Sequence, residues 1–160
     1  ESEALRKAAI VGDWSWLNKT LVTGPDAQRF MSYATVKDIS RLEPGRIMFT
    51  PMVNAAGKVA IEGLTWKFGD NEFIFTQSGG QSWLPQVLRL TDFDVTLEDV
   101  TPDYSCFHLQ GPKATEILEL VTGEDCRSLR FSRWRMARVA ANPSMTGICT
   151  SMSTRSYRPV

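Results

Sequence analysis

The chain has 160 residues, of which 42% are hydrophobic and 10% aromatic, and its 18 basic side chains balance 18 acidic ones. This composition is enough for one domain with a hydrophobic core and argues against a disordered chain. The balanced charge gives no electrostatic basis for binding nucleic acid or a membrane surface, and no apolar run approaches the roughly 20 residues that span a bilayer. The cysteines are widely spaced and fit neither a disulfide framework nor a zinc site, so we expect a reducing, cytoplasmic compartment (Cys106, Cys126 and Cys149).

The hydrophobic pattern predicts short helices and strands in succession along the first two thirds of the chain. Residues 2–9 are typical of a helix, and residues 10–23 of an extended segment that buries its large side chains, Trp14, Trp16, Leu17 and Leu21. The other predicted elements are a helix from Gly24 to about Tyr33, strands over 47–53, 58–68 and 72–77, a helix over 81–90, and strands over 93–97 and 104–109. Strands joined by short turns and followed by helices favour an α+β fold, with a mixed, largely antiparallel sheet and helices packed on one side.

The pattern Gly-Pro-x-Ala occurs twice, at residues 24–27 and 111–114. Each copy follows a strand-like run and opens an amphipathic stretch. Glycine at the cap and proline at the first helical position suit the start of a helix, because proline lacks an N–H that would have no partner there. Two strand–turn–helix units of one design indicate an internal duplication.

The last third of the chain is basic. After Asp125 there is no acidic residue, and the basic residues are all arginine (Arg127, Arg130, Arg133, Arg135, Arg138, Arg155 and Arg158). Residues 131–140 predict a strand, and the Ser-, Thr- and Met-rich stretch from Ala141 onward, which has no clear period, predicts a frayed tail. A solvated basic strand is favoured over a patch for an anionic ligand, since runs of charge usually form solvated faces.

The first 125 residues or so resemble the tetrahydrofolate-binding family of the glycine-cleavage T-protein. The resemblance rests on segments that follow the family's order: Leu-Val-Thr-Gly-Pro-Asp-Ala at 21–27, Asp-Ile-Ser and Pro-Gly-Arg within 38–46, Phe-Thr-Pro-Met-Val-Asn and Gly-Lys-Val within 49–59, and Leu-Gln-Gly-Pro-Lys-Ala at 109–114. It implies a folate-binding fold in which three subdomains surround a central hole. A full member is more than twice as long, so residues 1–125 would form the N-terminal folate-binding-like domain, and residues 126–160 the start of a following subdomain or an altered tail.

The resemblance also implies a site. In the family, the strand after the central hairpin carries a carboxylate that faces the reacting end of the folate, and this position falls on Glu62. Such a carboxylate can steer protons and stabilise transient positive charge on a ring nitrogen. The folate-contacting positions fall on Phe49, Met52, Asn54 and Ser78, with Phe49 and Ser78 replacing the family's usual phenol and asparagine. For Glu62 an ordinary solvent-facing strand position stays open, as does core packing for Phe49 and a turn cap for Asn54.

Two functions follow as alternatives. The first is a tetrahydrofolate-dependent methyl- or aminomethyltransferase, similar to aminomethyltransferases or demethylases, with tetrahydrofolate as cofactor and a small-molecule one-carbon donor. The second is a non-catalytic folate-binding module or assembly factor of the same fold. The remainder of a longer chain or a second copy is the expected protein partner, and neither nucleic acid nor a membrane is expected. Residues 145–150 lack the acidic groups that grip the pterin ring in the family, so the chain is expected to lack half of the folate site.

Overall fold

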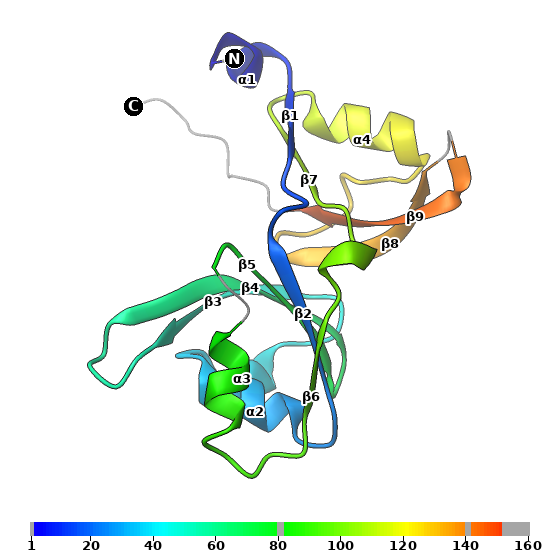
Figure 1. Cartoon of the computed structure of the whole chain (residues 1–160). Coiled ribbons are helices and arrows are strands. Elements are labelled where there is room, and N and C mark those ends of the chain that lie inside the picture. The colour runs from blue at the N-terminus through cyan, green and yellow to red at the C-terminus, as the bar shows by residue number, and fades with distance from the viewer. Residues whose placement is uncertain (1, 80–81, 140–141, 152–160) are drawn as a thin grey trace. The chain divides into compact units, whose positions relative to one another are not determined.

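The computed structural model describes residues 2–79, 82–139 and 142–151 (Figure 1). Contacts divide the chain into two compact units, one formed by residues 1–11 with 109–160 and the other by residues 12–108. The predicted boundary after residue 125 therefore lies inside the first unit. Each unit is described by itself. None of the helices in the described part of the chain is long and apolar enough to cross a membrane.

The unit of residues 12–108 is built on a five-stranded antiparallel sheet in the order β3-β4-β5-β2-β6. Its strands are β2 (Asn18–Thr23), β3 (Ile47–Val53), β4 (Val59–Gly69), β5 (Glu72–Gln77) and β6 (Thr96–Asp99). The predicted bounds of β3 and β5 are confirmed. Short turns with Asn and Gly join β3 to β4 and β4 to β5, which is the chemistry that tight hairpins require.

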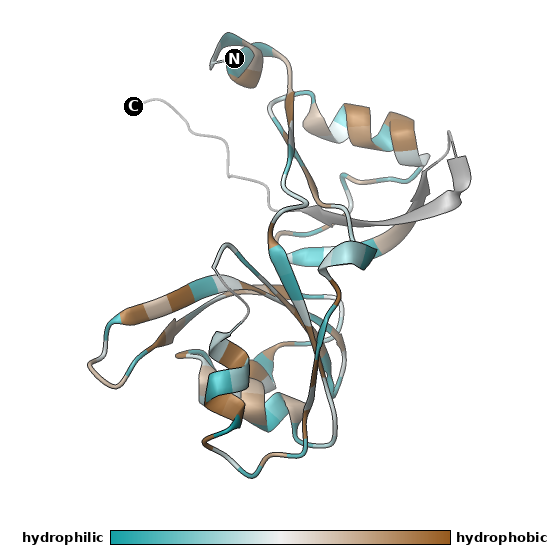
Figure 2. Ribbon diagram, in the orientation of Figure 1, coloured by the Kyte–Doolittle hydropathy of each residue, from teal (hydrophilic) through white to brown (hydrophobic). Residues whose placement is uncertain are grey.

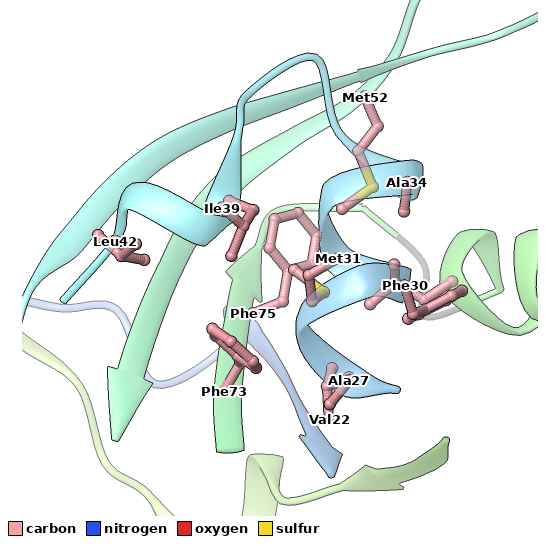
Figure 3. Close-up of a cluster of buried hydrophobic side chains, with 11 residues drawn as sticks. Val22, Ala27, Phe30, Met31, Ala34, Ile39, Leu42, Met52, Phe73 and Phe75 are labelled. Atoms are coloured by element: carbon pink, nitrogen blue, oxygen red, sulfur yellow. The ribbon is translucent and has the colours of Figure 1, made fainter. Parts of the chain in front are cut away.

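One face of this sheet carries the hydrophobic core. Helices α2 (Ala27–Ala34) and α3 (Trp83–Leu88) lie on the same side of the sheet in Figure 1, and the short helix η1 (Ile39–Arg41) contacts α2. Phe30 and Met31 of α2 pack against Val22, Phe73 and Phe75 of the strands, and all five side chains are fully buried (Figure 3). Burying each such side chain contributes roughly 1.5–3 kcal/mol. The predicted α+β fold, with a largely antiparallel sheet and helices on one side, is confirmed.

Both Gly-Pro-x-Ala segments form turns, but the helices begin later than predicted. Gly24 and Gly111 have φ of +126° and +132°, a conformation that favours glycine. The N–H of Ala27 donates to the carbonyl of Gly24, and that of Ala114 to Gly111, both at 3.0 Å. The prolines therefore lie inside the turns, and α2 and α4 (Ala114–Thr122) begin at the alanines. The prediction of proline at the first helical position is wrong.

Two other predictions are also wrong. The segment between β1 (Ile10–Asp13) and β2 is a turn, and Trp14 and Trp16 within it are exposed, whereas we expected both in the core. The stretch from Ala141 was expected to fray, yet β9 (Asn142–Ser151) pairs with β8 (Arg133–Val139) in an antiparallel ladder. Tertiary pairing forms this strand without a regular hydrophobic period. The remainder of the predicted tail, residues 152–160, lies outside the described residues.

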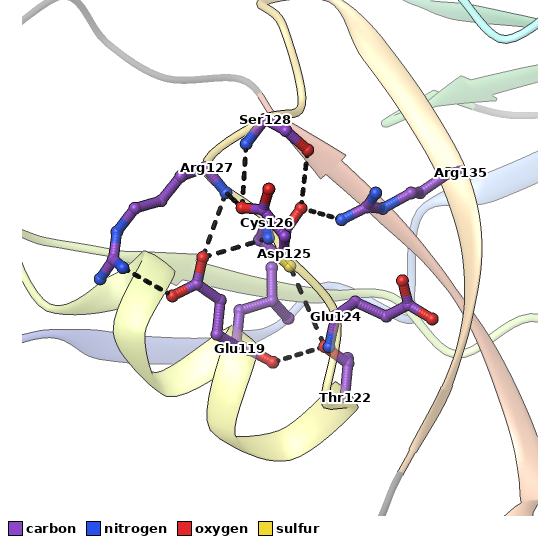
Figure 4. Close-up of polar contacts among 9 residues, drawn as sticks. Glu119, Thr122, Glu124, Asp125, Cys126, Arg127, Ser128 and Arg135 are labelled. Carbon is purple, nitrogen blue, oxygen red and sulfur yellow. Dashed lines mark hydrogen bonds and ion pairs between the residues drawn. The ribbon is translucent and has the colours of Figure 1, made fainter.

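The other unit contains α1 (Ser2–Lys7), α4 and the β8–β9 ladder. A two-stranded sheet joins β1 to β7 (Phe107–Gln110), which follows the short helix η2 (Thr101–Asp103). The loop after α4 is fastened by the carboxylate of Glu119, which accepts hydrogen bonds from the N–H groups of Cys126 (3.1 Å) and Arg127 (3.2 Å) (Figure 4). Exposed hydrophobic residues lie on α4 and on the β3–β4 hairpin, and both elements contain hydrophobic stretches coloured brown in Figure 2.

Candidate functional site

The sheet face opposite the core presents the predicted carboxylate beside an aromatic ring. In the β3–β4 ladder Phe49 pairs with Leu64, and Pro51 pairs with Glu62. Successive strand residues point to opposite faces, and the neighbouring Thr50 and Met52 are fully buried on the core side. Phe49, Pro51, Glu62 and Leu64 therefore share one surface, which we call the open face. The arrangement places a single negative charge within an apolar surround.

Phe49 is 51% exposed, which is unusual for a large aromatic side chain in a strand and excludes simple core packing. Among the described residues, the Phe49 ring stacks on no other ring, since the ring pairs of this unit involve Trp14, Phe30, Tyr33 and their neighbours. An exposed phenyl ring can stack against a planar heterocycle. Phe49 therefore fits the pocket-wall interpretation better than the core interpretation.

Glu62 lies in β4 with its side chain exposed. Among the described residues, no hydrogen bond or ion pair reaches its carboxylate. A carboxylate without a partner keeps all of its acceptor positions open for a ligand. With no side-chain partner, the carboxylate is positioned by the backbone of β4.

Met52 and Asn54 have structural environments. Met52 is fully buried on the core face and points into the cluster around α2 (Figure 3), which favours packing over contact with a ligand. The Oδ1 atom of Asn54 accepts hydrogen bonds from the N–H groups of Ala56 (3.0 Å) and Lys58 (3.1 Å), so it caps the β3–β4 turn. Asn54 keeps only its amide N–H groups for another partner.

Ser78 follows the end of β5 and is exposed. The next residue, Gly79, lies against β4, because a Cβ there would be 3.0 Å from Cδ1 of Ile61. The structure thus brings Ser78 to the part of β4 that carries Glu62. The side-chain amide of Asn18 donates to the carbonyl of Gly79 and fastens this segment to β2. The sequence analysis missed Asn18, since only the register of β2 against β5, with Asn18 opposite Gln77, places it there.

The remaining reactive side chains do not form a second centre within the described residues. No cluster of His, Cys, Asp and Glu there could hold a metal ion. Burial raises the pKa of the Cys106 thiol above its usual value, so this thiol stays protonated near neutral pH and is a poor nucleophile. His108 is exposed and meets Trp14 edge to face, with 5.6 Å between ring centroids. This ring contact is typical of a structural role for His108.

Two arginines of the basic stretch are engaged inside their own unit. Arg127 forms an ion pair with Glu119 (3.1 Å), and the guanidinium of Arg135 donates to the carbonyl of Asp125 (Figure 4). An exposed ion pair of this kind contributes about 0–1 kcal/mol. The contacts favour a structural role for these two side chains over a free patch for an anionic ligand.

The fold is that of a T-protein-like domain. The model of the GCVT N-terminal domain matches residues 1–151. The chain belongs to this family, which confirms the resemblance and extends it past Asp125 into β9.

Curated relatives agree with this assignment. An aminomethyltransferase of Clostridium botulinum (strain Loch Maree / Type A3) is 31% identical over 140 residues, which cover 84% of this chain and 37% of the relative. An aminomethyltransferase of Oceanobacillus iheyensis is 29% identical over 140 residues, which cover 84% of this chain and 38% of the relative. The chain therefore spans about two fifths of the length of the curated relatives it matches.

Solved structures share the fold. The crystal structure of glycine cleavage system aminomethyltransferase T from Bartonella henselae matches with a TM-score of 0.73 and 22% identity, covering 85% of this chain and 40% of that one. Heterotetrameric sarcosine oxidase from Corynebacterium sp. U-96 contains a chain that matches with a TM-score of 0.62 and 17% identity, covering 86% of this chain and 69% of that one. At these identities the likeness concerns the fold alone.

Proposed function

We propose that this chain is the N-terminal portion of a tetrahydrofolate-dependent transferase that moves an aminomethyl or methyl group between a small-molecule donor and tetrahydrofolate. The observation that carries the proposal is the exposed, unpartnered carboxylate of Glu62 beside the exposed ring of Phe49 on the open face. Membership of the GCVT N-terminal domain family and the relatives named aminomethyltransferase support it.

The residues of the open face fit the chemistry of the reaction. Tetrahydrofolate, when bound, supplies the ring nitrogen that gains or loses the one-carbon unit. A planar pterin ring can stack on Phe49, while Glu62 accepts a proton from the ring nitrogen or stabilises positive charge as the carbon–nitrogen bond forms or breaks. The hydroxyl of Ser78 and the amide N–H groups of Asn54 can donate hydrogen bonds to ring acceptors. Met52 would contribute through packing behind β3. We also propose a cytoplasmic location, since Cys106 and Cys126 are free thiols.

Glu62→Gln in the natural full-length protein tests the proposal, because it removes the charge and the basicity at nearly constant volume. We expect kcat for transfer from a panel of one-carbon donors to fall by about 10²-fold or more, which is the usual contribution of a general acid or base. The dissociation constant for tetrahydrofolate, measured by isothermal titration, should change much less. Glu72→Gln is the matched control, since Glu72 is also an exposed strand glutamate of this sheet. Unchanged turnover in Glu62→Gln would remove Glu62 from the mechanism.

A non-catalytic folate-binding module is the second candidate. The observation that weakens the transferase candidate is the absence of any acidic residue after Asp125, which leaves residues 145–150 without a carboxylate for the pterin ring. This candidate predicts tetrahydrofolate binding without turnover of any donor. Isothermal titration of tetrahydrofolate into residues 1–160 alone tests whether this chain holds a complete folate site. Micromolar or tighter binding would show that it does.

A further inference from the structure

The backbone N–H and carbonyl of Glu62 face β5 rather than β3. Glu62 pairs with Pro51, which has no N–H to donate. The carbonyl of Pro51 accepts a hydrogen bond from the N–H of Val36 (3.2 Å), on the edge of β3 that faces away from β4. In an antiparallel strand the N–H and carbonyl of one residue face the same neighbour. Pro51 and Glu62 therefore form a non-hydrogen-bonded pair, and the backbone groups of Glu62 point toward β5.

On the β5 side the ladder ends one residue before Glu62. The last β4–β5 pair is Gly63 with Gln77, and β5 itself ends at Gln77. Gly63, which directly follows Glu62, is therefore the first residue of β4 that is paired with β5. The position of the Glu62 backbone depends on how closely the two strands approach at this pair.

Gly63 permits a very close approach. A Cβ at this position would lie 2.2 Å from the carbonyl oxygen of Thr76 and 2.8 Å from Cζ of Phe75. The Phe75 ring is fully buried and covers the glycine on the core side. Since the first of these neighbours is backbone and the core is close-packed, a side chain at residue 63 must displace β4 by about 1 Å.

The register of β3 against β4 is fixed separately. The hydroxyl oxygens of Thr50 and Thr65 are 2.7 Å apart and both residues are fully buried on the core face. A slip of β4 by one residue would carry the Thr65 hydroxyl to the open face and Glu62 to the core, so the pair of threonines keeps Glu62 outward. What remains to be set is the distance of Glu62 from β5, and Gly63 controls it.

We propose that Gly63 is a positioning residue, which places the carboxylate of Glu62 on the open face by allowing β4 to close onto β5. The inference rests on the proposed role of Glu62 and names the backbone contact on which that role depends. A displacement of about 1 Å at a reacting group can cost on the order of 10²-fold in rate, so the contact matters for turnover more than for folding of the sheet.

A double-mutant cycle in the full-length protein tests the proposal. Gly63→Ala should lower kcat by roughly 10- to 100-fold while Glu62 is present, and should have little further effect in the Glu62→Gln background, because it acts through that carboxylate. A merely structural defect would lower turnover by the same factor in both backgrounds. Gly69→Ala is the matched control, since it lies in the same strand and a Cβ there would make only ordinary contacts at 3.6 and 3.7 Å.

The outcomes separate the two ideas. If Glu62→Gln leaves turnover unchanged, the proposed role of Glu62 fails and the positioning role fails with it. If Glu62→Gln lowers turnover but Gly63→Ala does not, or lowers it equally in both backgrounds, only the positioning role is overturned. Circular dichroism and thermal unfolding report whether Gly63→Ala folds. If it does not fold, the contact at Gly63 serves the folding of the sheet and the positioning role is overturned.

Discussion

The two Gly-Pro-x-Ala turns have almost the same backbone conformation, but the helix after the first turn is buried and the helix after the second is not. The third residue of each turn, Asp26 or Lys113, donates its N–H to the carbonyl of a distant segment, at 3.2 Å to Asp94 and 2.9 Å to Ala8. Both acceptors lie two residues before a strand, β6 or β1. The agreement in hydrogen bonds and in glycine conformation supports the internal duplication that the sequence predicts.

The helices that follow the two turns differ in what they bury. Four residues of α2 are buried in the core, whereas no side chain of α4 is fully buried. Phe30 and Ile117 occupy equivalent positions, since each donates its N–H to the third residue of its turn. Phe30 is fully buried, while Ile117 is 37% exposed. Four residues therefore determine the local turn, whereas the burial of the helix that follows depends on the surface against which it packs.

Truncating these two equivalent side chains should give the largest difference between the copies, measured as the loss in free energy of unfolding. Phe30→Ala should lower the free energy of unfolding by about 3–5 kcal/mol, the usual cost of removing a buried phenylalanine. Ile117→Ala should cost about 1 kcal/mol or less, because much of its surface already meets water. Urea unfolding with an unchanged m-value measures both. Equal losses would contradict the difference in burial between α2 and α4.

Replacing the glycine of either turn with alanine should lower the stability of the protein by a similar amount. A Cβ at Gly24 would lie 2.5 Å from the carbonyl oxygen of Asp94, and one at Gly111 would lie 2.6 Å from that of Ala8. Since both glycines also have positive φ, Gly24→Ala and Gly111→Ala should each cost about 2 kcal/mol or more. Gly69→Ala again serves as the control and should change stability by less than about 1 kcal/mol. A neutral Gly111→Ala would show that the second turn does not need the geometry of the first.

These comparisons explain which features could be predicted from the sequence. The bounds of β3 and β5 follow from local patterns and turn residues. The structure places Glu62 exposed in β4, the second strand of the hairpin, and its role in a site stays a prediction from the resemblance. The burial of Met52 could not be predicted in this way, because it depends on which sheet face α2 covers. The close contact of Gly63 depends on the approach of β5, which no pattern within β4 reveals.

The smallest expected difference is in pH dependence, and it comes from the one side-chain contact that the turns do not share. The carboxylate of Asp26 accepts hydrogen bonds from the N–H of Asp94 (3.2 Å) and from Arg29 (2.7 Å). The bond from Asp94, followed by that from Arg29, lowers the pKa of Asp26 below its usual value. Lys113 occupies the same place in the second turn and has no carboxylate to accept such bonds.

A carboxyl with a lowered pKa in the folded state stabilises the protein above its unfolded pKa of about 3.9, and this stabilisation is lost as the pH falls through the lower, folded value. The melting temperature of Asp26→Asn should therefore lie below that of the parent at pH 6–7, and the gap should narrow below about pH 4. Taking the difference cancels the titration of the other carboxyls. Lys113→Gln should show a gap that does not change with pH over this range. A constant gap for Asp26→Asn would mean that the charge of Asp26 does not strengthen the first turn, and the two copies would then differ only in the burial of their helices.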